Sequence, residues 1–356
     1  MEYGIAVATT TESWKVAARA EALGFDFVWF YDTQLLNPDV FVCMAQAAMK
    51  TERIQLATGV LIPTNRIEPV AANAFVSLNK IAPGRIHFGV GTGYTGRRTM
   101  NLRAIPLADM HRYVERVLAL TRGETVTLSL EGGEQQVAFL DPDSTLINTS
   151  DPIRLHTSAL GPKARRLAAE LGGGWINFGG DEQGAIKTLD NMRSAWEEAD
   201  RDPADLYSTL FALGCILDEG EAFDSERALA QAGPYVAVFF HNLVETSAPG
   251  AMEAVLGKTV SDQLEAYRTI YLSYPESERH LHNHRGHLMY LRDDERFLIT
   301  PELIESLTFT GTRPQLRARL GALDAAGYSQ FCVQLVEGEL DALEGWAELF
   351  GLGTAR

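Results

Sequence analysis

Histidines crowd one short segment of the chain, and histidine is the side chain best suited to proton transfer near neutral pH. Four of the eight histidines, His280, His282, His284 and His287, lie in the segment R-H-L-H-N-H-R-G-H at positions 279–287. This density also suits metal ligation, but no acidic residue or cysteine completes a recognised ligand pattern, so we expect no metal. We expect His284 and His287 to act as general acid or base, or to orient a substrate. A structural or solvent-exposed role is the alternative.

Glycine and threonine end two strands whose composition is typical of buried parallel strands. Residues 53–66 read R-I-Q-L-A-T-G-V-L-I-P-T-N-R, and residues 84–94 read G-R-I-H-F-G-V-G-T-G-Y. Glycines at the carboxyl edge of a parallel sheet, here Gly59, Gly91 and Gly93, let a flat ligand approach the backbone. The alternative is that they only form tight turns.

A third strand end has the features of a phosphate site. Ser158, Ala159, Leu160 and Gly161 follow a predicted strand at 153–157, and Pro162 begins the next helix. The free N–H groups and positive dipole end of a helix attract a phosphate, and the Ser158 hydroxyl adds a donor.

These strand ends belong to a repeated strand–helix pattern that runs through most of the chain. The predicted strands lie at 3–8, 25–31, 54–60, 85–90, 153–157, 175–178, 207–217 and 330–336, with a hairpin at 126–140 turning at Gly132 and Gly133. Eight strand–helix pairs predict an α/β fold, a closed (β/α)8 TIM barrel, as a single domain over residues 1–356. Residues 218–310 break the pattern and predict a largely helical insertion between strands seven and eight, either a lid or a subunit contact.

Composition narrows the class of protein. The chain has 356 residues, 46% of them hydrophobic, and a net charge of −16, which argues against nucleic acid or an anionic membrane as the main partner. The cysteines Cys43, Cys215 and Cys332 lack the close spacings of a disulfide framework or zinc site, so we expect reduced core residues. No signal-like segment and no long apolar run is found, and we expect a cytoplasmic protein.

Taken together, the motifs resemble those of the bacterial luciferase-like flavin-dependent oxidoreductases, and most closely the branch with methylenetetrahydromethanopterin reductase. The resemblance rests on A-T-G-V-L-I-P-T-N-R, on the helix that begins with Glu68 and Pro69, on G-R-I-H-F-G-V-G-T-G and on S-A-L-G-P-K-A-R-R-L-A-A-E-L-G-G-G-W. It covers nearly the whole chain and is weakest across the insertion. It implies a TIM barrel that binds FMN or a deazaflavin, assembled as a homodimer or homotetramer.

The resemblance also implies the residues that contact the cofactor. These are Asp32, Ala57, Thr58, Gly59, Val60, Gly91, Thr92, Gly93, Ser158, Ala159, Leu160, Gly161 and Trp175. It implies a non-prolyl cis peptide between Gly59 and Val60 behind the flavin ring. Tyr94 corresponds to the substrate-side wall and joins His284 and His287 as a candidate catalytic residue, with simple packing as the alternative.

Departures from the family pattern bear on the reaction. Many deazaflavin-dependent dehydrogenases carry Asp-His where this chain has Asp32 and Thr33, sugar phosphate dehydrogenases place glutamate where Tyr94 stands, and some deazaflavin enzymes have a lysine near Asp181. These absences favour a two-component monooxygenase that receives reduced FMN from a separate flavin reductase and uses O2 on a small organic substrate. The alternatives are a hydride-transfer oxidoreductase using coenzyme F420 and a non-catalytic flavin-binding protein.

Overall fold

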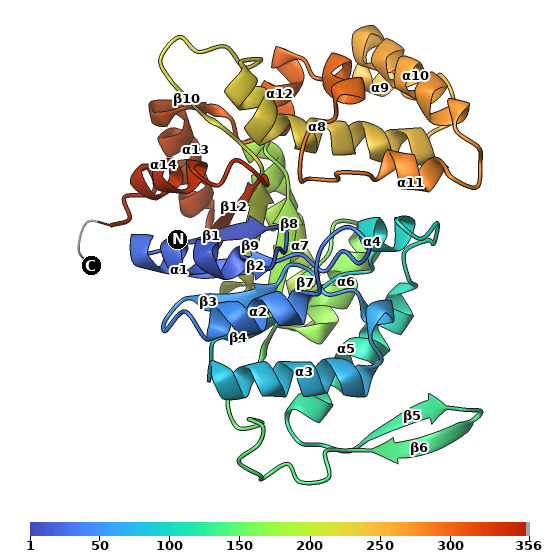
Figure 1. The fold of residues 1–356 in the computed structure, drawn as a ribbon, viewed down its shortest axis with the longest axis vertical. Coiled ribbons are helices and arrows are strands. Elements are labelled where there is room, and N and C mark those ends of the chain that lie inside the picture. The colour runs from blue at the N-terminus through green and yellow to red at the C-terminus, as the bar shows by residue number, and fades with distance from the viewer. Residues whose placement is uncertain (354–356) are drawn as a thin grey trace.

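Eight parallel strands close into a barrel in the computed structural model, which describes residues 1–353 (Figure 1). The barrel strands are β1 (Glu2–Val7), β2 (Phe27–Phe30), β3 (Gln55–Thr58), β4 (Ile86–Val90), β7 (Arg154–Ser158), β8 (Gly174–Phe178), β9 (Tyr207–Ala212) and β12 (Gln330–Leu335). Closure occurs between the first and last of these, because β1 pairs in parallel with both β2 and β12. The predicted (β/α)8 barrel is confirmed.

Helices surround the strands and bury their outward-facing side chains. These helices are α1 (Ser13–Leu23), α2 (Val40–Ala48), α3 (Glu68–Ile81), α5 (Leu107–Thr121), α6 (Pro162–Leu171), α7 (Glu182–Glu198), α13 (Arg313–Ala326) and α14 (Ala342–Leu349). Because successive strand residues point to opposite faces, Val28 and Phe30 of β2 pack against the helices, whereas Phe27 and Trp29 fill the barrel interior. Short 3-10 turns η1 (Pro63–Asn65) and η2 (Pro203–Asp205) complete this layer.

A hairpin extends from the barrel on the side away from the insertion (Figure 1). It consists of β5 (Val126–Leu130) and β6 (Gly133–Val137), paired antiparallel as predicted. The turn itself falls one residue earlier than predicted, on Glu131 and Gly132, with φ angles of 50° and 83°. A two-residue hairpin turn requires positive φ at both central positions, so Gly133 is free to begin the second strand.

The insertion between the seventh and eighth barrel strands forms a separate helical layer at one end of the barrel (Figure 1). It contains α8 (Glu226–Thr246), α9 (Glu253–Leu256), α10 (Lys258–Ser273), α11 (Arg279–Asn283), η3 (Asp293–Leu298) and α12 (Pro301–Leu307). These helices share an apolar core of their own, in which Val236, Phe240, Leu264 and Leu298 are buried. The predicted helical insertion is confirmed as part of the fold.

The predicted seventh strand, at 207–217, is divided in the structure. β9 ends at Ala212, and β10 (Ile216–Leu217) pairs instead with β11 (Gly311–Thr312), where the chain returns from the insertion. Gly214 marks the break, because a Cβ there would lie 2.0 Å from the carbonyl oxygen of Phe309. Because the chain that returns from the insertion passes so close to Gly214, the residues after Ala212 do not pair within the barrel sheet.

Two further expectations concern the state of the cysteines and the absence of a membrane-spanning helix. Cys43, Cys215 and Cys332 are all buried and unpaired, as predicted. Within residues 1–353, none of the helices combines the length and apolar character needed to cross a bilayer.

Candidate active site

A cavity of about 770 Å³ opens at the carboxyl ends of the barrel strands, between the barrel and the insertion. Its barrel side is lined by residues at or after the ends of β2, β3, β4, β7 and β8. Its other side is lined by α8, α12 and the segment that follows α11. Catalytic groups in TIM barrels are placed at this end, so the cavity is the candidate active site.

Backbone, rather than side chains, forms the central part of the barrel wall. Gly59, Val60, Gly91, Thr92 and Gly93 all line the cavity, and the peptide between Gly59 and Val60 is cis, as predicted. A Cβ added at Gly91 would lie 2.8 Å from Cγ2 of Val60. At Gly93, where φ is 75°, a Cβ would lie 2.6 Å from a side-chain carbon. The strand ends thus present a surface without protruding side chains, which suits a planar ring.

Two residues predicted to contact the cofactor lie behind this wall. Ala57 and Thr58 are fully buried and do not line the cavity. The Thr58 hydroxyl instead donates to the carbonyl oxygen of Gly89 at 2.7 Å. These are the last two residues of β3, and their side chains pack among the strands.

Asp32 lines the cavity but is chiefly occupied with its own neighbours. The backbone N–H of Ile62 donates to Asp32 Oδ2 at 3.1 Å, and Arg66 Nη1 lies 3.0 Å from Oδ1. Arg66 also pairs with Asp39 at the start of α2. The buried carboxylate therefore fastens the loop after β3 to the end of β2, and its cofactor contact stays a prediction.

The predicted phosphate turn lies at one end of the cavity. Ser158, Leu160 and Gly161 line it, and α6 begins directly afterwards with Gly161 as its N-cap residue. Ala159 and Trp175, however, are buried beneath the turn, where the Trp175 indole N–H donates to the Ala159 carbonyl at 2.8 Å. Trp175 points outward from β8 into the packing layer, and the contact of these two residues with the cofactor stays a prediction.

The short helix α4 (Tyr94–Arg98) joins the barrel to the insertion. The Tyr94 hydroxyl donates to the side chain of Asn242 on α8, and the Arg98 guanidinium lies over the Tyr94 ring, 3.9 Å from its centre. Arg98 also pairs with Glu245, one turn further along α8. Tyr94 lines the cavity, and its place on the substrate side stays a prediction.

The structure brings part of the histidine-rich segment into the cavity. His284 and His287 both line it, as the catalytic hypothesis requires. His282 does not, since its ring stacks on Tyr274 with 3.7 Å between ring centres. A third cavity histidine, His241 of α8, was not predicted.

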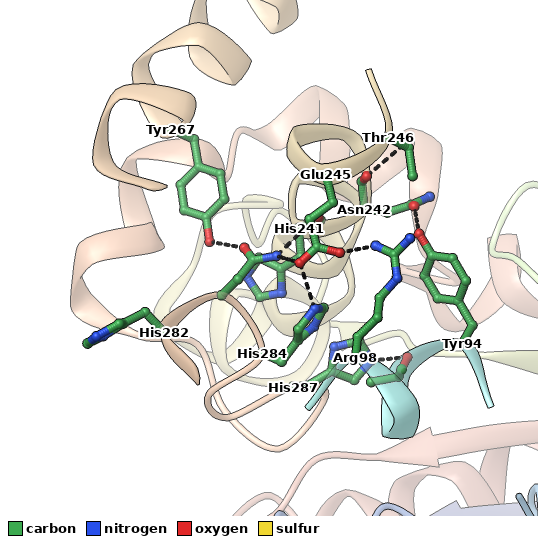
Figure 2. A network of polar contacts seen from close by, with 12 residues as sticks. Tyr94, Arg98, His241, Asn242, Glu245, Thr246, Tyr267, His282, His284 and His287 are labelled. Carbon is green, nitrogen blue, oxygen red and sulfur yellow. Dashed lines mark hydrogen bonds and ion pairs between the residues drawn. The ribbon is translucent and has the colours of Figure 1, made fainter. Parts of the chain in front are cut away.

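These three side chains, His241, His284 and His287, form a cluster that we call the histidine cluster (Figure 2). One ring nitrogen of each lies within 4.8 Å of one ring nitrogen of each of the others. Every Nε2 atom has its own partner: Glu295 for His241, Glu245 for His284 at 2.8 Å, and Thr95 for His287 at 3.2 Å. The three rings are thus oriented from three separate segments.

Burial determines the protonation state of the histidine cluster. It lowers the pKa of His284 to about 4, with the charges of Arg98 and Arg292 acting in the same direction. Burial also lowers the pKa of His241 and His287 well below the ordinary value. All three imidazoles are therefore neutral at neutral pH and carry a free lone pair.

The residues that the sequence did not reveal all lie on one face of α8. His241 and Glu245 are four positions apart, and Asn242 follows His241 directly. The spacing of His241 and Glu245 was the available signal, because residues four apart share a helix face. An isolated histidine in an amphipathic helix cannot be told from a core histidine without knowing what packs against it.

The cavity of this α/β barrel has a glycine wall, a helix N-terminus at one end and titratable groups at the other. This combination is typical of α/β-barrel oxidoreductases. Comparison with known sequences agrees, because the profile of the luciferase-like monooxygenase family matches residues 4–330. The chain belongs to this family.

Curated relatives include deazaflavin enzymes. An F420-dependent glucose-6-phosphate dehydrogenase of Beutenbergia cavernae is 33% identical over 229 residues, which is 59% of this chain and 64% of the relative's length. A 5,10-methylenetetrahydromethanopterin reductase of Methanolobus tindarius is 27% identical over 67% of this chain and 71% of that protein. The chain thus aligns with somewhat under two thirds of the first relative.

Solved structures of the same fold use either cofactor type. The coenzyme F420-dependent tetrahydromethanopterin reductase of Methanopyrus kandleri superposes with a TM-score of 0.70 and 16% identity over 98% of each chain. The oxygenating component of 3,6-diketocamphane monooxygenase of Pseudomonas putida, in complex with FMN, gives 0.62 and 14% identity over 98% of this chain and 95% of the other. At these identities the comparison supports the fold alone.

Proposed function

We propose that the chain is a coenzyme F420-dependent oxidoreductase that transfers a hydride between the deazaflavin and a small organic substrate. The observation that carries the proposal is the sequence match to an F420-dependent dehydrogenase at 33% identity. The FMN-containing structural neighbour is matched at only 14% identity. The sequence motifs alone favoured the opposite ranking, with a monooxygenase that uses reduced FMN and O2 first and the F420-dependent enzyme as an alternative.

The cavity fits a flat tricyclic cofactor. The glycine wall at Gly59, Gly91 and Gly93 would carry the ring, since any side chain at these positions would collide with neighbouring atoms or fill the slot. Ser158 and the N-terminus of α6 would hold a phosphate at the other end. When bound, the deazaflavin supplies a ring carbon that accepts or donates a hydride.

The side chains of the protein must take up the proton that is released when the hydride is transferred. Oxidation of an alcohol removes a hydride from carbon and a proton from oxygen, and the cofactor takes only the hydride. The groups that can receive the proton, directly or through a bound water or ion, are His284 and His287. Both are neutral at neutral pH because burial lowers their pKa, so each can accept a hydrogen bond from a substrate hydroxyl, and the Glu245 carboxylate beside His284 would stabilise the imidazolium that forms on proton transfer.

The cavity wall also restricts the substrate. Among the described residues that line it, none is lysine or arginine, and the carboxylates present are those of Asp32 and Asp181. Apart from the turn assigned to the cofactor phosphate, a sugar phosphate would find no cationic side chain on this wall, and the Asp181 carboxylate would disfavour a second anion, whereas Asp32 is already paired with Arg66. We therefore propose a small uncharged alcohol or carbonyl compound as the substrate, rather than glucose 6-phosphate.

A direct test compares cofactors on the purified protein. Fluorescence titrations with coenzyme F420, oxidised FMN and reduced FMN should show the tightest binding for F420. The complex with reduced F420 should then be scanned against a panel of aldehydes and ketones, with loss of reduced cofactor followed by absorbance.

The other outcomes assign the competing functions. Tighter binding of reduced FMN, with a peroxyflavin appearing on rapid mixing with O2, would replace the proposal by the monooxygenase. F420 binding without turnover on any substrate class would favour a non-catalytic binding protein. Absence of binding to either cofactor would contradict all three.

A further inference from the structure

We infer that His241, His284 and His287 form a binding site for one divalent transition-metal ion, with an open coordination position facing the cavity. Their nitrogen atoms come within 4.8 Å of one another, and all three residues line the cavity. We expected no metal from the histidine-rich segment alone, but the third ligand comes from α8. It does not depend on which cofactor the barrel binds.

The unpaired atoms of the cluster are the first argument. Nδ1 of each of the three rings is buried and has no hydrogen-bond partner among the described residues. His241 and His284 are only 2% and 4% exposed. A buried acceptor without a donor is costly, and three of them on adjacent rings need a common explanation. A cation bound by these lone pairs provides one.

The groups behind the rings are the second argument. Histidines that bind a metal almost always donate their other N–H to a carboxylate, a carbonyl or another acceptor, which fixes the tautomer. Here Nε2 of His241 faces Glu295 and Nε2 of His284 faces Glu245, while Nε2 of His287 faces the Thr95 hydroxyl. With Nε2 as the donor in each pair, the lone pair is left on Nδ1.

Further contacts hold the two carboxylates in place. Glu295 is 1% exposed, lies 2.6 Å from Arg292 Nη2 and accepts a hydrogen bond from the Tyr267 hydroxyl at 3.4 Å. Burial raises the pKa of Glu295 to about 7, whereas the adjacent Arg292 charge favours its ionised form. Glu245 accepts from Arg98 and from the Asn283 amide, the latter at 2.7 Å. Figure 2 shows the part of this network around Glu245, with Arg98 on one side and His284 on the other.

The ligand set defines the kind of ion. Three neutral imidazoles suit Zn²⁺, Co²⁺, Ni²⁺ or Fe²⁺, whereas Mg²⁺ and Ca²⁺ prefer oxygen ligands. Tetrahedral zinc with Zn–N bonds of about 2.0–2.1 Å needs about 3.4 Å between ligand nitrogens. Modest inward rotation of the rings would meet this spacing. The fourth position would face the cavity, where a hydroxyl or carbonyl oxygen of a substrate could bind and be polarised.

Cobalt is a suitable probe because a tetrahedral Co²⁺ site absorbs visible light. The untagged full-length chain, stripped with a chelator and titrated with Co²⁺, should develop this absorption with one ion per chain. Zn²⁺ should displace it. His241→Ala, His284→Ala and His287→Ala should each weaken Co²⁺ binding by about 100-fold or more, and Glu245→Gln by about 10-fold or more.

His282→Ala is the matched control, because His282 belongs to the same segment but stacks on Tyr274 outside the cluster. It should bind Co²⁺ as the wild type does. Circular dichroism melting checks each variant, and His287→Ala, at the least buried of the three positions, decides the test if the other two fail to fold. A wild-type chain without the absorption, or binding that His282→Ala weakens as much as His287→Ala, would overturn the inference.

Discussion

The two sides of the cavity are built from different parts of the polypeptide. On the barrel side, Gly59 and Gly91 expose backbone, and added Cβ atoms would lie within 3 Å of Trp29 and Val60 respectively. On the insertion side, the wall combines apolar side chains such as Phe239 and Leu307 with buried polar ones such as His284, which the Glu245 carboxylate orients.

The barrel wall therefore determines the shape of the cavity, whereas the insertion wall supplies the groups that can react. The barrel wall is determined by short stretches of sequence at strand ends, and it can accept any planar cofactor of the right size. The insertion wall requires α4, α8 and the segment after α11 to meet, and it holds the groups that can act on a substrate. The residues that shape the cavity and the groups that could act on a substrate therefore lie in different parts of the chain.

The largest effect should come from Glu245→Ala on the insertion side. This carboxylate is 13% exposed and accepts hydrogen bonds from Arg98, Asn283 and His284. Its removal leaves a largely buried guanidinium without its counter-ion, so we expect the free energy of unfolding to fall by about 3 kcal/mol. Urea unfolding followed by circular dichroism measures this change.

Glu226→Ala supplies the matched control on the same helix. Glu226 pairs with Arg296, but the two side chains are 85% and 42% exposed. Exposed pairs contribute little, so this substitution should cost at most about 1 kcal/mol. If both variants lost the same free energy of unfolding, the insertion wall would be no more stable than the exposed surface. The proposed difference between the two walls would then be wrong.

Sequence reasoning succeeded where the determinants are local. The glycine-ended strands, the turn at Ser158 and the barrel itself follow from patterns a few residues long. It failed where distant segments decide the outcome. Trp175 was assigned to the cofactor by the family resemblance alone, which does not reveal that the alternation of β8 directs its ring outward. His241 could be placed in the cavity only by the packing of α8 over the barrel.

A second prediction tests whether the shape of the barrel wall determines how tightly the cofactor binds. In Gly91→Ala the new Cβ would lie 2.8 Å from Val60 Cγ2, and Val60 itself lines the cavity. The strain would be relieved by moving Val60 into the space for the ring. We expect the affinity for F420 to fall at least tenfold, or about 1.4 kcal/mol, as measured by fluorescence titration.

Gly321→Ala is the control for this change. Gly321 lies on α13 and does not line the cavity, and nothing lies within 4 Å of its added Cβ. Its affinity should stay within about twofold of wild type, since a twofold change is well under 1 kcal/mol. If both alanine variants bind alike, close approach at Gly91 is not what shapes the cofactor site.

The smallest effect concerns the ion pair of Asp39 with Arg66, beside the barrel wall. Asp39 caps α2 by accepting from the N–H groups of Phe41 and Val42, and it pairs with Arg66, which also holds buried Asp32. Burial acts to raise the pKa of Asp39, but the hydrogen bond and charge of Arg66 outweigh it, so the pKa is lowered. The resulting stabilisation is present above the unfolded pKa of about 3.9 and is lost as pH falls through the lower folded value.

Asp39→Asn should preserve the helix cap while removing the charge, because asparagine caps helices as well as aspartate does. The Asp39 side chain is 48% exposed, so the variant should lose less than about 1 kcal/mol at pH 7. Below about pH 4 its stability should approach that of the wild type, giving a shallower dependence on pH. Urea unfolding in steps from pH 7 to pH 3 measures both profiles. Parallel profiles would show that charge contributes nothing to the barrel wall, which would sharpen its contrast with the insertion wall.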